Sequence, residues 1–132
     1  MRTVTSRAFL RDQAPVLVWM ALIFTASSIP SGRFPDVSIF RFDKLIHLVI
    51  YGVLGFLMHR ALSRQSRFPL LARWAALWSV LFCVLYGVSD ELHQSFVPGR
   101  DMSGYDLIAN TAGALLSAVI VRVRTGRWGG VD

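Results

Sequence analysis

Hydrophobic residues are gathered into four continuous runs along the chain, separated by shorter polar segments. The runs do not alternate between apolar and polar positions, and leucine and alanine are abundant in them, so we predict helices rather than strands. Backbone groups in lipid must be paired within their own segment, which also selects helices. Each run is near the lower end of the roughly 17–25 residues that cross a bilayer. The runs are Ala14–Ile29, Leu45–Leu62, Leu70–Val88 and Leu107–Val121.

This pattern predicts an all-α fold, an integral membrane four-helix bundle in which residues 1–132 form a single membrane domain. The composition agrees, because only 17% of the residues are charged, against about 25% in a typical soluble protein. The expected transmembrane helices are at about residues 14–29, 45–62, 70–89 and 107–121.

The distribution of charge predicts an orientation. Ten of the fourteen basic residues lie in the amino-terminal segment, in the second connection and at its junction with the third run, and in the tail. Cytoplasmic loops carry an excess of Lys and Arg, so we expect both termini in the cytoplasm and the lipid bilayer as the first partner. The basic residues form no continuous stripe, which argues against a nucleic-acid partner. The loops expected outside contain Asp36, Asp43, Asp90, Glu91, Asp101 and Asp106.

A cleaved signal peptide is the alternative interpretation of the first run, because small residues at 25–28 follow it. Pro15, Trp19 and the length of the run favour an anchored span instead. Both interpretations leave the acid-rich loops on the outer side.

Polar side chains recur at helical spacing on the acid-rich side of three predicted helices. Asp43, His47 and Tyr51 are four residues apart, so they share one face of a helix. In the third helix Tyr86, Asp90 and either His93 or Gln94 make a matching stripe, and Asp106 and Asn110 share a face of the fourth. Because polar groups avoid lipid, these stripes should face one another in a pocket that opens to the outer face. Residues expected in or near it are Asp43, Lys44, His47, Tyr51, Asp90, Glu91, His93, Gln94, Arg100, Asp106 and Asn110.

These side chains include groups suited to acid–base catalysis and groups suited to binding phosphate. A histidine paired with a carboxylate has the parts of a general base, which makes catalytic candidates of Asp43, His47, Asp90, Glu91 and His93. Lysine and arginine neutralise phosphate oxygens. The substrate-binding candidates are Lys44, Tyr51, Gln94, Arg100, Asp106 and Asn110. The alternative is structural, with buried polar pairs that fix the packing of the helices.

Other features make smaller contributions to the prediction. Pro98–Gly99 is a turn signal, and residues 97–104 are expected to form a loop that caps the site. A metal is an alternative, because histidine and carboxylate oxygens bind zinc or manganese. No metal site is assigned, because the chain lacks a His-Glu-x-x-His pattern, and the sequence names no cofactor. Cys83 is expected to be buried, and His59 is expected to be a solvated or snorkelling group at the cytoplasmic end of its helix.

Three blocks together resemble the VanZ-like family, over about residues 16–121: Asp43–Lys44 with His47 and Tyr51, then Asp90–Glu91–x–His93–Gln94–x–Phe96–x–Pro98–Gly99–Arg100, then Asp106–x3–Asn110–x2–Gly113. The resemblance implies a small, multi-pass protein of the bacterial inner membrane with a role in the cell envelope. The family's namesake is linked to teicoplanin resistance, but the resemblance supplies no settled reaction.

The expected function is therefore to hydrolyse, transfer or bind a lipid-linked or phosphate-bearing envelope substrate. A lipid-linked envelope precursor or an anionic head group is the expected partner. The alternative is a non-catalytic binding or accessory protein whose buried polar residues hold the bundle together.

Overall fold

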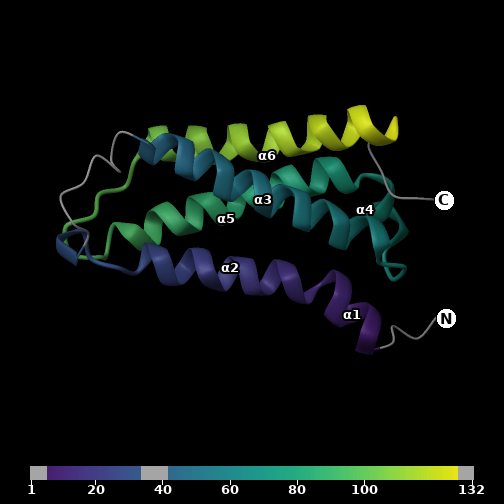
Figure 1. The fold of residues 1–132 in the computed structure, drawn as a ribbon, viewed down its shortest axis with the longest axis horizontal. Helices are drawn as coiled ribbons and strands as arrows, with labels where there is room; N and C mark the ends of the chain where they lie inside the picture. The colour runs from purple at the N-terminus through teal and green to yellow at the C-terminus, as the bar shows by residue number, and fades with distance from the viewer. Residues whose placement is uncertain (1–5, 34–41, 128–132) are drawn as a thin grey trace.

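The structure is a computed structural model that describes residues 6–33 and 42–127, and every regular element in these residues is helical. Figure 1 shows α2, α3, α5 and α6 running along the long axis of the molecule. The elements are α1 (Ser6–Asp12), α2 (Ala14–Ser27), the 3-10 turn η1 (Ser31–Arg33), α3 (Asp43–Arg64), α4 (Pro69–Arg73), α5 (Ala75–Gln94) and α6 (Gly104–Thr125).

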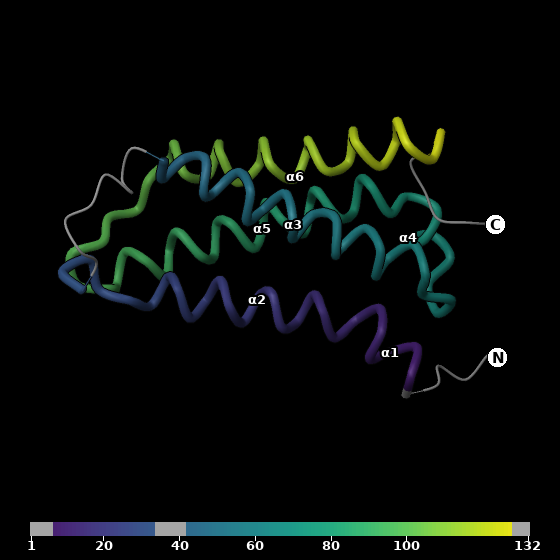
Figure 2. The backbone as a smooth tube through the Cα atoms, viewed as in Figure 1, coloured from purple at the N-terminus to yellow at the C-terminus, as the bar shows by residue number. Residues whose placement is uncertain are grey.

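The two ends of the molecule carry different elements, as the tube in Figure 2 also shows. The start of α1, the short helix α4 and the end of α6 lie at one end, here named the α4 end. The turn η1 and the α5–α6 loop lie at the other, here named the η1 end. Helices α3, α5 and α6 pack on one another, and α2 packs against α3 and α5.

Three helices, α3, α5 and α6, are long and apolar enough to cross a membrane by length and composition. The first predicted span is shorter than expected, because α2 ends at Ser27 and has 14 residues. At 1.5 Å per residue it is about 21 Å long, less than the roughly 30 Å hydrocarbon core. Its start is set by Pro15, which has no N–H and is accepted only in the first turn of a helix.

The third run predicts one helix over about 70–89, whereas the structure divides this stretch between α4 and α5 and ends α5 at Gln94. The chain leaves helical geometry at Trp74 (φ −112°, ψ 33°), which separates α4 from α5. Helix α5 then continues through its polar residues to Gln94. It does so because Asp90 and Glu91 are buried against other helices, where the bundle supplies their partners.

Large and small residues are distributed as in a membrane protein. Many large apolar side chains, such as Leu77, Leu115 and Val123, are exposed, while the interior is rich in alanine, glycine and polar residues beside a few large side chains such as Leu54. A water-soluble bundle would bury its large side chains, whereas lipid-facing helices pack through small residues. The predicted burial of Cys83 is confirmed. The prediction that His59 is a solvated or snorkelling group is wrong, because His59 is buried, with 8% of its surface exposed.

Helices α3 and α6 lie close together at Gly113. A Cβ atom added there would collide with the backbone carbonyl oxygen of Leu48 and with the backbone nitrogen of Gly52. Gly55 is similarly close to Ser117. This approach brings the polar stripe of α3 against that of α6 at the η1 end.

At the α4 end, one buried carboxylate ties α1 to α3. Asp12 accepts hydrogen bonds from Arg11 (2.7 Å), Arg64 (3.2 Å) and Arg60 (3.3 Å). Hydrogen bonding from Arg11, assisted by Arg64 and Arg60, lowers the pKa of Asp12 to about 2.

Asp12 is therefore expected to make stability depend on acid pH. A carboxyl group of lowered pKa stabilises the fold above its unfolded value of about 3.9, and this contribution is lost as pH falls towards 2. Melting temperatures in detergent should be higher for the wild type than for Asp12→Asn at pH 6. The difference should shrink between pH 4 and pH 2.5, and an unchanged difference would refute the assignment.

Candidate functional site

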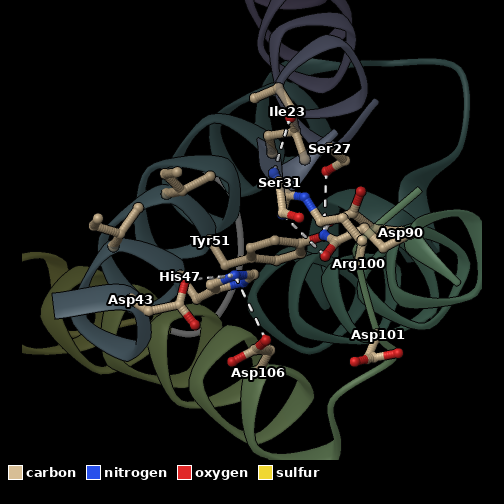
Figure 3. A pocket seen from close by; sticks show the side chains of 15 residues that line it. Ile23, Ser27, Ser31, Asp43, His47, Tyr51, Asp90, Arg100, Asp101 and Asp106 are labelled. Atoms are coloured by element: carbon tan, nitrogen blue, oxygen red, sulfur yellow. Dashed lines mark hydrogen bonds and ion pairs between the residues drawn. The ribbon is translucent and has the colours of Figure 1, made fainter. Parts of the chain in front are cut away.

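A cavity of about 330 Å³ lies at the η1 end, enclosed by α2, α3, α5, the start of α6 and the loop before it (Figure 3). Polar and apolar side chains both contribute to its wall, so it has room for part of a ligand with a polar head. The lining residues are Ile23, Ala26, Ser27, Ser31, Asp43, Ile46, His47, Ile50, Tyr51, Asp90, Gln94, Gly99, Arg100, Asp101 and Asp106.

One wall is a charged network between the first turn of α3 and the first turns of α6. The ammonium group of Lys44 bonds to Asp43 (3.0 Å) and is also paired with Asp106. The backbone N–H of Asp106 donates to the side chain of Ser103, which caps α6. The network thus fixes both carboxylates relative to the helix ends.

His47 lies at the centre of this network. Its Nδ1 is 2.9 Å from Oδ1 of Asn110, and its Nε2 is 3.7 Å from Asp43 and 3.9 Å from Asp106. Figure 3 shows the ring between the two carboxylates, at the edge of the cavity. With the Asn110 oxygen as acceptor, Nδ1 carries the hydrogen and Nε2 faces the cavity side. A histidine held in this way by a third group has the arrangement of a general base.

The opposite wall comes from α5 and α2. The hydroxyl of Tyr51 donates to Asp90 (3.3 Å), and the amide of Gln94 donates to the same carboxylate (3.4 Å) and to Ser27 (3.3 Å). Tyr51 and Asp90 are both buried, with 1% and 5% of their surfaces exposed. The Tyr51 hydroxyl therefore connects the polar stripe of α3 to that of α5 in the wall of the cavity.

The loop before α6 closes the site through Arg100. The guanidinium donates to the carbonyl oxygens of Ala26 and Ile29 and to the side chain of Gln94. These bonds hold the loop against the carboxyl end of α2, where carbonyl groups attract a cation. Gly99 makes the turn with φ +74°, a backbone conformation that favours glycine.

Four of the predicted site residues lie near the cavity but do not line it. Lys44 and Asn110 act through their bonds to Asp106 and His47. Glu91 is buried and accepts the backbone N–H of Ser103 (2.9 Å), so it anchors the loop. His93 faces α2, 2.9 Å from the hydroxyl of Ser28 and stacked on Phe24. The other seven predicted residues line the cavity together.

The sequence does not predict a contribution of α2 and η1 to the site. Ala26 and Ser27 of α2 and Ser31 of η1 line the cavity. Ser27 is a polar residue near the end of the first apolar run, which is the one signal that points to it.

The cavity is acid-rich, because Asp43, Asp90, Asp101 and Asp106 line it and Arg100 is the only lysine or arginine among the described lining residues. Ligand atoms of Asp43, His47 and Asp106 lie within 4.8 Å of one another, so these three residues could hold a metal ion. The ammonium group of Lys44 already contacts both carboxylates. This ammonium group supplies positive charge beside Asp43 and Asp106, as a metal ion would. A metal ion that binds there would have to displace it.

Apolar helices of spanning length and a polar cavity at one end define a helical membrane protein with an interior polar site. The chain matches the family described as VanZ/LLP1 over residues 13–125, and it belongs to this family. No curated protein and no solved structure matches it.

Proposed function

We propose that the protein is a multi-pass protein of the bacterial inner membrane, a single four-helix domain with both termini in the cytoplasm. Helix α2, preceded by α1, would be the fourth and shortest span. In the described residues, nine arginines lie in the elements and connections of the α4 end, against one carboxylate, Asp12. The carboxylates of the site gather at the η1 end. The excess of basic residues supports a cytoplasmic α4 end and an outward cavity.

Cysteine labelling tests this orientation. The native Cys83 is buried, so a single added cysteine can be labelled against a low background. Ser95 and Ser66 are exposed. Ser95 follows the end of α5, at the η1 end, and Ser66 lies between α3 and α4, at the α4 end. We expect a membrane-impermeant maleimide to label Ser95→Cys in intact cells, and Ser66→Cys only after the inner membrane is permeabilised. The reverse pattern would invert the orientation.

We further propose that the cavity receives the head group of a lipid-linked envelope molecule and carries out acid–base chemistry on it, as hydrolysis or transfer. The observation that carries this proposal is His47, held by Asn110 at Nδ1 with Nε2 beside two carboxylates. In this role Nε2 takes a proton from a water molecule or from a substrate hydroxyl. A protonated imidazole would then be stabilised by Asp43 and Asp106.

The residues that line the cavity indicate which chemical group of the substrate it would accept. Four carboxylates repel a bare phosphate, whereas carboxylates and the Tyr51 hydroxyl suit the hydroxyl groups of a sugar. A phosphate link would lie at the rim, near Lys44. The apolar residues Ile46 and Ile50 continue the wall towards lipid, where an isoprenoid chain would lie.

Reconstituted protein tests this function. Wild-type protein in nanodiscs would be incubated with isoprenoid phosphates and with phosphate-linked sugars, and the products followed by ³¹P NMR and mass spectrometry. We expect a new phosphorus resonance that requires the protein. In cells, the same role predicts a change in glycopeptide susceptibility when the protein is removed.

One observation favours the second candidate, a non-catalytic accessory protein held together by its polar residues. The site's side chains pair largely with one another, as in Tyr51 with Asp90 and Lys44 with Asp106. In that case His47→Gln lowers the melting temperature, and the nanodisc assay gives no product with any variant.

A further inference from the structure

A second cavity, of about 500 Å³, lies at the α4 end between the last turns of α3 and α6. Its lining is basic, because four arginines contribute to it and no carboxylate is among the described residues that line it. The lining residues are Phe56, His59, Arg60, Ser63, Arg64, Ile120, Val121, Arg124, Thr125 and Arg127.

Two buried polar atoms of this lining have no hydrogen-bond partner among the described residues: Nε2 of His59 and Nε of Arg60. His59 is more than nine-tenths buried, with 8% of its surface exposed. Buried polar atoms are nearly always hydrogen-bonded. Both nitrogen atoms belong to residues that line this cavity and can donate a hydrogen bond, so a ligand that offers acceptor oxygens would satisfy them.

The charge of the surroundings specifies an anion. Asp12 is a single carboxylate that already pairs with three guanidinium groups, including those of Arg60 and Arg64. The hydroxyls of Ser63 and Thr125 donate to backbone carbonyl groups of their own helices. The arginines are thus the main donors, and guanidinium groups match phosphate oxygens in two-pronged geometry.

The apolar part of the lining specifies a lipid. Phe56 and Ile120 are 49% and 43% exposed, so they extend the cavity onto the lipid-facing surface of α3 and α6. A free phosphate ion would make no favourable contact with these apolar side chains, whereas an acyl chain would pack against them.

We propose that this cavity binds the phosphate of an anionic phospholipid from the adjacent leaflet. Arg64 and Arg124 contact the head group, His59 donates or accepts at its base, and Phe56 and Ile120 contact the acyl chain. Basic pockets between membrane helices are a known way of holding such head groups. The site lies at the opposite end from the first cavity and does not depend on the function proposed for it.

Native mass spectrometry of the detergent-solubilised full chain tests this proposal, with phosphatidylglycerol, phosphatidylcholine and inorganic phosphate as probes. Arg124→Gln is the test variant, because Arg124 is exposed and makes no contact with Asp12. Arg73→Gln is the matched control: it removes an exposed arginine at the same end, outside the cavity.

We expect one phosphatidylglycerol to bind in preference to phosphatidylcholine. Arg124→Gln should weaken this binding about fivefold, the factor that corresponds to about 1 kcal/mol per basic residue, while Arg73→Gln leaves it unchanged. Equal losses in the two variants would mean a diffuse charge effect and overturn the site. Inorganic phosphate that binds as tightly as the lipid would overturn the lipid assignment, and so would equal binding of phosphatidylcholine.

Discussion

Replacing His47 with glutamine is expected to lower the turnover of a lipid-linked substrate by about a hundredfold or more, the lower bound for loss of a general base. Glutamine is close in size and keeps a polar group near Asn110, but it cannot accept a proton. Because the glutamine amide can bond to Asn110 and to the two carboxylates in place of the imidazole, the change should leave the fold in place. Turnover would be measured in nanodiscs, with the melting temperature recorded on the same samples.

His93→Gln is the matched control. His93 is the second histidine among the residues predicted for the site. It does not line the cavity but contacts Ser28 and Phe24. We expect turnover close to that of the wild type. Loss of turnover in His93→Gln with retention in His47→Gln would move the base to α5 and refute the assignment.

The largest effect on stability is expected at Gly113. An alanine Cβ there would collide with the backbone of α3 at Leu48 and Gly52, and neither atom can move without the whole helix. The two helices would have to separate, and overpacking of this kind costs about 1–3 kcal/mol. The melting temperature of Gly113→Ala in detergent should fall by several degrees, and the polar cavity, which depends on the same interface, should lose its ligand.

Gly104→Ala is the control for this effect, because it makes the same change in the same helix. Nothing lies within 4 Å of a Cβ atom added at Gly104, so this variant should be as stable as the wild type or slightly more stable. Equal melting temperatures for the two variants would show that α3 and α6 do not approach as closely as described.

Much of this architecture was predictable because apolar runs and helical spacing are local properties. The four-residue spacing of Asp43, His47 and Tyr51 places them on one face of α3, and the structure has all three lining one cavity. In α5 the spacing alone left His93 and Gln94 as alternatives, since a period of 3.6 residues accommodates both. Contacts with α2 determine which of the two lines the cavity. Gln94 bonds to Ser27 in the cavity wall, whereas His93 stacks on Phe24 outside it.

The features that the sequence did not predict depend on contacts between distant segments. The burial of His59 results from the packing of α3 in the bundle, which its local sequence does not reveal. The break at Trp74 interrupts an apolar run that has no proline or glycine at that position. The role of Arg100 in holding the loop to α2 depends on carbonyl oxygens more than seventy residues away.

Native mass spectrometry of the protein gently extracted from its own membrane tests the central claim, that the cavity at the η1 end holds a lipid-linked ligand. Ala26→Phe fills this cavity without removing a polar side chain, and Ala21→Phe makes the same change on α2 at an exposed position outside the cavity. We predict a lipid-linked adduct that is present in the wild type and in Ala21→Phe, lost in Ala26→Phe, and unaffected by Arg124→Gln. An adduct that persists in Ala26→Phe, or none in any folded variant, would contradict the claim.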